Sequence, residues 1–281
     1  MTMNWNYLEI AELLHASATR VLTHRRNLSW NQKKDDSLVT AVDRENEAFL
    51  RENLTRQGDF FLGEESIEGL GHGYLRDALR GPCFVVDPID GTAPFAHGFP
   101  LWGISIGHLQ HGRLDNGAVI LPELDECLLS QDGGVHWAKN ISGPPSTWQW
   151  LEIPYAEKPW SSGDMLTLGQ QFTRAHRDLP FSNPLLTSGS AVQALASIVT
   201  GHSIAYVGVM KLWDIAGMLP ILEALSIEIR LWDGTPVTCA LASGVFDLDF
   251  ASPHCWRFRD DLYCGTAAFC SQFRRYLETV R

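Results

Sequence analysis

The chain has 281 residues, of which 45% are hydrophobic and 10% aromatic, enough for one large domain or two closely packed halves. Its formal net charge is −11, so we expect neither nucleic acid nor an anionic membrane surface as a partner. Apolar runs are too short to cross a bilayer, and the amino-terminal segment lacks the apolar core of a secretory signal. The six cysteines show no zinc-binding spacing, which favours reduced thiols in a cytoplasmic protein; a Cys264–Cys270 disulfide is the alternative.

The first half of the chain is predicted to form two helices followed by an antiparallel sheet. Apolar side chains spaced by threes and fours predict a helix over residues 5–26, and Asp43 is the predicted N-cap of a second helix. A short helix ending at Gly81 is predicted between two strands. The predicted strands of this half are 59–63, 83–87, 101–110, 113–121, 126–131 and 135–139, the last four forming two hairpins.

The second half alternates strands and helices after a connector over residues 141–163 that is rich in Ser, Gly, Pro and Trp. This alternation predicts an α/β layer, and we divide the chain into residues 1–145 and 146–281. The predicted strands are 184–188, 203–208 and 227–232, and the predicted helices are 191–201, 214–225 and 264–280.

Residues 87–92, with the sequence DPIDGT, place two carboxylates at the end of an apolar strand. Pro88 keeps Asp87 extended, and Gly91 permits a backbone conformation that other residues resist. Thr92 is expected to cap a short helix, which would leave amides at the turn as anion donors. Such a turn can hold a divalent cation beside a phosphate. Taken alone, it is equally compatible with a polar turn closed by an Asx hydrogen bond.

Three further carboxylates stand at similar junctions. Glu64 follows a predicted strand, whereas Asp43 and Asp214 each begin a predicted helix. Each has an ordinary interpretation, as a solvated loop residue or a plain N-cap. Because strand ends and helix starts meet at the ligand-binding edge of an α/β sheet, we expect them to converge with residues 87–92. Oxygen ligands without His or Cys suit Mg²⁺, so the sequence predicts a polycarboxylate Mg²⁺ site.

The order of these motifs resembles the inositol monophosphatase family, the lithium-sensitive, Mg²⁺-dependent phosphomonoesterases. The shared motifs are LVTAVD at 38–43, GEE at 63–65, DPIDGT at 87–92 and WDIAG at 213–217. The resemblance covers roughly residues 5–240. It implies a layered α-β-α-β-α sandwich, hydrolysis of a small-molecule phosphate monoester, and a homodimer. No covalent nucleophile is expected, because the sequence contains no GxSxG and no suitable Cys–His pairing.

The resemblance further implies two to three Mg²⁺ ions. Glu64, Asp87 and the carbonyl oxygen of Ile89 would bind the first ion. Asp87, Asp90 and Asp214 would bind the second, so that Asp87 bridges the two. A third, weaker ion would rest on Glu64. In this arrangement, residues 1–145 carry most of the metal ligands and residues 146–281 contribute Asp214.

The resemblance to the family also implies which residues bind the phosphate and activate the attacking water. The amides of Gly91 and Thr92 would hold the phosphate. Glu64 and the Thr92 hydroxyl would orient the attacking water, and Asp43 would support the cluster from behind. Two metals would offset the phosphate charge and lower the pKa of the water during an in-line displacement.

The resemblance also gives five substrate-side positions: Gly189, Ser190, Ala191, Val207 and Lys211. Val207 stands where inositol-hydrolysing members have a Glu that contacts sugar hydroxyls, and Val cannot accept a hydrogen bond. Lys211 has two interpretations: it would face the leaving group and favour a substrate with extra negative charge, or it is a surface lysine at a strand end. The pattern of Lys33, Asp35, Ser37 and the residues that follow is closer to members that act on histidinol phosphate or 3′-phosphoadenosine nucleotides. These two are therefore the alternative substrates.

Two other functions stay open from the sequence. A non-catalytic relative that binds a metal or phospholigand without turnover is suggested by Val207 and by EALS at 223–226, where the family has EAGG. An assembly role is suggested by the tryptophan-rich segment 148–160, which is predicted to be an exposed contact surface.

Overall fold

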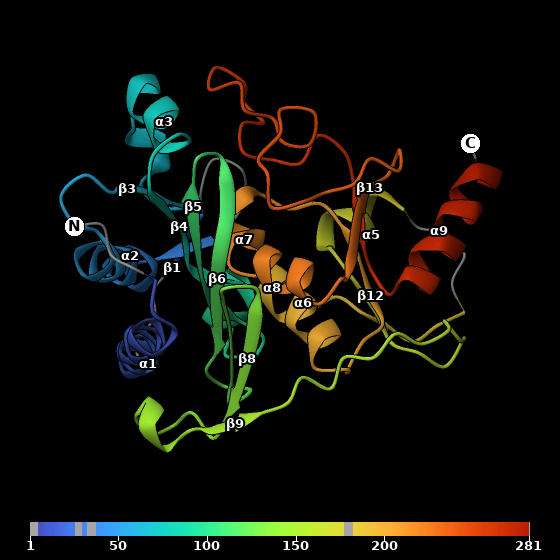
Figure 1. Ribbon diagram of the computed structural model, residues 1–281, viewed down its shortest axis with the longest axis horizontal. Coiled ribbons are helices and arrows are strands. Elements are labelled where there is room, and N and C mark those ends of the chain that lie inside the picture. Colours follow the sequence, from blue (N-terminus) through green and yellow to red (C-terminus); the bar gives the residue numbers. More distant parts are fainter. Residues whose placement is uncertain (1–4, 26–29, 33–37, 177–181, 281) are drawn as a thin grey trace.

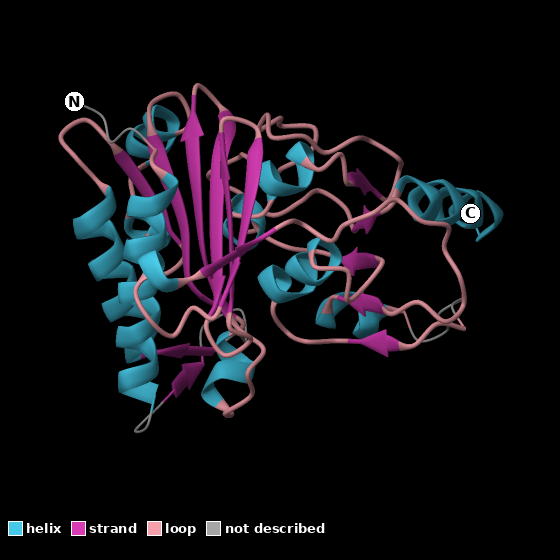
Figure 2. Cartoon of the chain, turned by 60° about the horizontal axis from the view of Figure 1, so that its bottom comes forward, coloured by secondary structure: helices cyan, strands magenta, loops and turns pink. Residues whose placement is uncertain are grey.

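The computed structural model describes residues 5–25, 30–32, 38–176 and 182–280. Its main elements form five layers, in which two β-sheets alternate with helices (Figure 1). Figure 2 shows long helices covering the outer face of the larger sheet and the carboxy-terminal helix beyond the smaller one. Apolar clusters fill the spaces on both sides of each sheet. The predicted layered α-β-α-β-α sandwich is thus confirmed.

The larger sheet has seven strands in the order β3-β4-β5-β6-β7-β8-β9. Only the β3–β4 pair is parallel, so the predicted antiparallel sheet is correct apart from this edge. Both predicted hairpins, β5–β6 and β7–β8, are present, whereas β9 was missed inside the predicted connector. The bounds are β3 (Phe60–Gly63), β4 (Cys83–Asp90), β5 (Gly103–Gln110), β6 (Arg113–Leu121), β7 (Glu126–Gln131), β8 (Gly134–Lys139) and β9 (Gln149–Leu151).

Two helices, α1 (Tyr7–His24) and α2 (Ala41–Leu54), cover the outer face of this sheet. On α1 the buried side chains recur at three- and four-residue intervals, as an amphipathic helix requires: Ile10, Leu14, Ala18 and Val21. They join one apolar cluster with residues of β4, β5 and β6. The packed helices therefore hold β4 in place, including the end of the strand that carries Asp87 and Asp90.

The smaller sheet has the order β11-β10-β12-β14-β13, with β14 antiparallel to both of its neighbours. Its strands are β10 (Leu166–Leu168), β11 (Leu185–Leu186), β12 (Ala205–Gly208), β13 (Glu228–Leu231) and β14 (Leu262–Gly265). Strands β10 and β14 were not predicted. The final helix is accordingly shorter than expected, because residues 262–265 form a strand before α9 (Ala267–Val280) begins.

Three helices, α6 (Ala191–Val199), α7 (Leu212–Ala216) and α8 (Leu219–Ala224), lie between the two sheets. The single helix predicted over 214–225 is in fact α7 followed by α8, whose first turn contains Pro220. The remaining elements are β1 (Trp30–Gln32), β2 (Leu38–Thr40), α3 (His72–Ala78), α4 (Thr92–Ala96), α5 (Gln170–Ala175) and two 3₁₀ turns (Ile67–Gly69 and Pro145–Thr147). Among the described helices, none is both long and apolar enough to cross a membrane.

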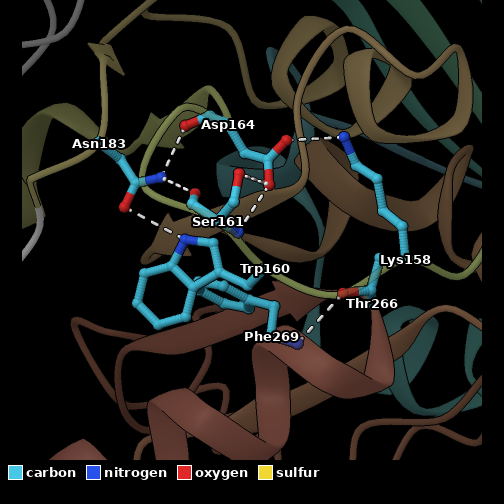
Figure 3. Close-up of polar contacts among 7 residues, drawn as sticks. All are labelled: Lys158, Trp160, Ser161, Asp164, Asn183, Thr266 and Phe269. Atoms are coloured by element: carbon cyan, nitrogen blue, oxygen red, sulfur yellow. Dashed lines mark hydrogen bonds and ion pairs between the residues drawn. The ribbon is translucent and has the colours of Figure 1, made fainter.

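The tryptophan side chains of the segment 148–160 are not exposed as predicted, although residues 149, 152, 154 and 156–159 are. Trp148 is only 6% exposed and belongs to the apolar cluster beneath α1. Trp160 packs edge-on against Phe269 at 5.2 Å between ring centres, and its indole N–H donates to Asn183 at 3.2 Å (Figure 3). These two rings pack the connector against the rest of the protein. The assembly role was suggested by exposed tryptophans, so it is no longer supported.

All six cysteines lie in the described residues and are free, so the alternative Cys264–Cys270 disulfide is not formed. Burial raises the pKa of both of these thiols well above its usual range. They therefore act as small core residues, Cys264 on β14 and Cys270 on α9. The division at residue 145 stays a prediction; the two sheets occupy residues 60–151 and 166–265.

Candidate metal and phosphate site

Three carboxylates from β4 and α7 meet at the centre of the molecule. One oxygen each of Asp87, Asp90 and Asp214 lies within 4.8 Å of the others. In a regular strand, residues three apart point to opposite faces. Here the register against β5 shifts between Asp87 and Asp90, so that β4 carries an extra residue at this point. This β-bulge turns both aspartates toward the same cluster.

Asp214 reaches the cluster because α7 lies directly against the sheet. A Cβ at Gly117 on β6 would stand 2.2 Å from the carbonyl oxygen of Gly217, just after α7. A Cβ at Gly107 on β5 would stand 2.7 Å from Ala216. Only glycine permits this approach of two backbones. The glycines thus set the distance between Asp214 and the aspartates of β4.

The turn after Asp90 has the conformation that the sequence predicted for Gly91. Gly91 has φ 89° and ψ 41°, in the left-handed region, and is the N-cap of α4. Thr92 is the first residue of that helix, so its predicted capping role is wrong. The first amides of α4 have no partner within the helix and mark an anion-binding position. The Thr92 hydroxyl lies 3.1 Å from the Ile89 carbonyl oxygen and 3.0 Å from Asp43 Oδ1.

Asp43 connects α2 to this turn from a fully buried position. The N-cap of α2 is Thr40 rather than Asp43, because the two form a reciprocal capping box with Asp43 as the third helical residue. Asp43 Oδ2 accepts from the amide and the hydroxyl of Thr40, and Oδ1 accepts from Thr92. Burial raises the pKa of Asp43, although the hydrogen bonds from Thr40 oppose the shift. Asp43 thereby fixes the Thr92 hydroxyl.

Asn46 and Glu47 complete this support and were missed from the sequence. The Asn46 amide donates to the Pro88 carbonyl oxygen at 2.8 Å and accepts from the Ser17 hydroxyl. Glu47 is 4% exposed and accepts from the backbone N–H of Glu65 at 2.7 Å. Their spacing could have revealed them: Asn46 and Glu47 follow Asp43 by three and four residues, so the three side chains share one face of α2.

Glu64 lies at the end of β3, where its N–H donates to the Val86 carbonyl oxygen at 3.1 Å. It is half-buried and is not one of the three carboxylates within 4.8 Å of each other. Its charge nonetheless raises the pKa of Asp43, Asp90 and Asp214, in each case after burial, which is the larger cause. Glu64, Asp43, Asp90 and Asp214 therefore form one electrostatic unit.

Ser190, predicted on the substrate side, also orients Asp90 through a hydrogen bond. Ser190 is the N-cap of α6, and its hydroxyl donates to Asp90. The amides of Ala191 and Val192 donate to the same carboxylate at 3.3 and 2.8 Å. Burial still raises the pKa of Asp90 to about 6, against these bonds. Asp90 is thereby oriented by the second half of the chain.

Asp214 is the third residue of α7, not its N-cap, which is Lys211. The Lys211 N–H donates to Asp214 Oδ2 at 2.7 Å. Burial, followed by the charges of Asp90 and Glu64, raises the pKa of Asp214 to about 8. The carboxylates therefore repel one another strongly and would gain from a cation. With three convergent oxygen ligands and no His or Cys, the cluster fits Mg²⁺.

A cavity of about 160 Å³ opens beside Asp90 and Asp214. Gly189, Ser190 and Ala191, which were predicted to lie on the substrate side, line it. The other side chains around it, which the sequence reasoning missed, include Gln170, Gln171, Ser188 and Tyr206.

Val207 and Lys211 do not line this cavity. Val207 is fully buried in the apolar cluster that faces α9, on the opposite face of β12 from Tyr206. Lys211 extends over the Trp213 ring, with Nζ 5.3 Å from its centre. Neither residue touches the cavity, so the structure gives no support to a direct substrate contact by Val207. Lys33, Asp35 and Ser37 lie outside the described residues.

Comparison with known proteins agrees with this geometry. The inositol monophosphatase family matches residues 5–255. The histidinol-phosphatase of Chlorobaculum parvum is 29% identical over 211 residues, covering 71% of this chain and 74% of the relative. Human inositol monophosphatase 1 is 28% identical over 193 residues, covering 64% and 66%. The solved structure of inositol monophosphatase II from Staphylococcus aureus shares the fold, with a TM-score of 0.71 and 23% identity over 97% of this chain and 95% of that one. The chain therefore belongs to the inositol monophosphatase family, whose members are phosphoric monoester hydrolases.

Proposed function

We propose that the protein hydrolyses the phosphate monoester of a small metabolite with the help of two to three Mg²⁺ ions. The observation that carries this proposal is the convergence of Asp87, Asp90 and Asp214 within 4.8 Å beside the left-handed turn at Gly91. Glu64 and the Ile89 carbonyl oxygen would complete the ligand set. When bound, the ions would neutralise the phosphate charge, acidify the attacking water and stabilise the leaving oxygen.

The chain's own groups would position the reactants. The amides of Gly91 and Thr92, at the start of α4, would donate to phosphate oxygens. The Thr92 hydroxyl directs its one proton toward Asp43 Oδ1 and the Ile89 carbonyl oxygen, so its lone pairs face away from them and can accept a hydrogen bond from the attacking water. Glu64 would hold the same water and take up its proton as the general base.

The substrate would extend from this phosphate position into the cavity between β10, α6 and β12. Gln170 and Gln171 present neutral amides there, and Arg257 donates to Gln171 at 3.4 Å. The buried Val207 offers no acceptor for inositol hydroxyls. The similarity to a histidinol-phosphatase makes histidinol phosphate the alternative substrate to an inositol phosphate, with 3′-phosphoadenosine nucleotides as a further candidate.

Phosphate release from a panel of inositol, sugar, histidinol and nucleotide monoesters, with and without Mg²⁺, tests this function. We expect turnover of at least one ester, and none in EDTA. Turnover in EDTA would contradict the metal assignment. Tight binding of an ester without any release would instead favour the non-catalytic relative.

We also propose a cytoplasmic homodimer, on the family resemblance alone. Light scattering from the purified chain tests the dimer, and a monomeric mass at micromolar concentration would contradict it. Cell fractionation tests the location.

Mg²⁺ binding is expected to tighten as the pH rises from about 6 to about 8. In the folded protein the pKa values of Asp90 and Asp214 are raised to about 6 and about 8, from the ordinary value of 3.8. The metal must displace these protons. Because the folded, metal-free chain binds more protons than the unfolded one, its unfolding free energy falls as the pH rises from about 4 to about 8.

Thermal unfolding in EDTA and in saturating Mg²⁺, across pH 5–9, measures both effects. The gain in Tm from Mg²⁺ should be larger at pH 8 than at pH 6. A larger gain at pH 6 would contradict the assigned ligands.

Thr92→Val is expected to lower kcat by about 10²- to 10³-fold with little change in KM. The valine has nearly the same shape, but it removes the hydroxyl that lies against Asp43 and Ile89. Thr92→Ser keeps the hydroxyl and should restore most of the rate. Steady-state kinetics on the best substrate of the panel provides the comparison, and equal losses in both variants would argue against a role for the hydroxyl.

A further inference from the structure

A second cavity lies far from the carboxylate cluster, between α3 and the segment 248–251. Its volume is about 410 Å³, within the range of small-molecule sites. The lining residues come from α3, at the upper left of Figure 1, and from the orange-red loop that precedes β14. It shares no lining residue with the cavity beside Asp90 and Asp214.

One wall of this cavity is basic. His72, Arg76 and Arg80 follow one another at four-residue spacing, from the first residue of α3 to just beyond its end, and share one face. All three side chains are exposed. Among the described residues, neither arginine forms an ion pair. In a chain of net charge −11, two uncompensated guanidinium groups beside a hollow indicate an anionic ligand.

The single carboxylate that lines the cavity, Asp249, does not neutralise this wall. Asp249 Oδ1 accepts from the Ala251 N–H at 3.0 Å, which ties the side chain to its own loop. Within the described residues, no ion pair joins Asp249 to α3. The two arginines therefore leave the cavity with an excess of positive charge.

The opposite wall is apolar and partly aromatic. Leu248, Phe250 and Ala251 line it, and the Phe250 ring stacks on the buried Trp256 at 5.4 Å and 30°. The His72 ring lies 5.8 Å from Phe250 across the cavity. The stack fixes the Phe250 ring, so a planar ligand would meet a surface that is already in place.

We propose that this cavity binds a nucleoside monophosphate, with its phosphate between Arg76 and Arg80 and its base against Phe250. Arginine pairs bind phosphate through paired N–H donors, and an aromatic face stacks on any base. The site is separate from the candidate catalytic centre, because Arg80 precedes the start of β4 whereas Asp90 ends it. The two ends of β4, Cys83 and Asp90, are roughly 23 Å apart along an extended strand, and Arg80 lies before the first of them.

Calorimetric titration of the full chain in EDTA, which removes the divalent ions that the catalytic centre needs, tests the site. The probes are 5′-AMP, adenosine and inorganic phosphate. We expect AMP to bind at least tenfold more tightly than either of the other two. Arg76→Glu with Arg80→Glu should weaken AMP binding at least tenfold, and Phe250→Ala about fivefold. Arg274→Glu with Arg275→Glu on α9 makes the same charge change elsewhere and should have no effect.

The proposal is overturned if adenosine or phosphate binds as tightly as AMP, or if the charge reversal on α3 leaves AMP binding unchanged. It is also overturned if Asp214→Asn abolishes AMP binding, because the nucleotide would then occupy the carboxylate cluster. Should the double charge reversal fail to fold, Arg76→Gln with Arg80→Gln removes both charges, and the same tenfold loss is expected.

Discussion

Asp87→Asn is expected to lower kcat/KM by about 10³-fold or more while the fold is retained. Asp87 is buried, and in the proposed mechanism it is the ligand shared by two ions. An amide has nearly the same shape but carries no charge, so the electrostatic attraction for Mg²⁺ is largely lost. Structure is preserved because the Ile89 N–H, which donates to Asp87 Oδ1 at 3.0 Å, can donate equally to an asparagine oxygen.

Two measurements separate this expectation from simple unfolding. In EDTA the variant should unfold at the same or a higher temperature, since one of three mutually repelling carboxylates is gone. The gain in Tm on adding Mg²⁺ should disappear. Asp132→Asn makes the same chemical change in the β7–β8 turn and should alter neither activity nor Tm. An Asp87→Asn enzyme within tenfold of the wild-type kcat/KM would show that Asp87 is not the bridging ligand.

The convergence of the acidic positions was predictable because strand ends and helix starts meet at one edge of an α/β sheet, although each carboxylate alone has an ordinary interpretation. Their exact roles at helix starts were not. Asp43 and Asp214 were both predicted as N-caps, and both are third residues of a helix. The N-cap residues are Thr40 and Lys211, each three residues earlier. In a capping box the first and fourth residues bond to each other, and a sequence pattern alone does not show which of the two is the N-cap.

The residues that were missed act through contacts that have no local signature. Asn46 binds the Pro88 carbonyl oxygen 42 positions away, and Ser190 binds Asp90 across 100 positions. The strands β10 and β14 are three and four residues long and obtain their stability from neighbours in the sheet. Tertiary pairing, rather than local propensity, decides such elements. The strong periodicity of α1 and the hairpin turns, by contrast, are local and were found.

Gly117→Ala is expected to destabilise the protein by about 3 kcal/mol or more and to remove Mg²⁺ binding. The new Cβ would lie 2.2 Å from the Gly217 carbonyl oxygen and 2.8 Å from its carbonyl carbon. Both are backbone atoms, so no side chain can rotate away. Either β6 or the segment after α7 must move, and the movement would carry Asp214 away from Asp87 and Asp90.

An ordinary core defect would lower stability alone, whereas a displacement of Asp214 would also weaken Mg²⁺ binding in the folded protein. Gly244→Ala is the matched control, because no atom lies within 4 Å of its Cβ position. At a temperature where Gly117→Ala stays folded by circular dichroism, its Mg²⁺ affinity and kcat/KM should both fall by about 100-fold or more. If the folded variant instead binds Mg²⁺ as tightly as the wild type, Asp214 does not depend on the contact between β6 and Gly217. The metal cluster would then be set by β4 alone, and the two glycine positions would serve stability only.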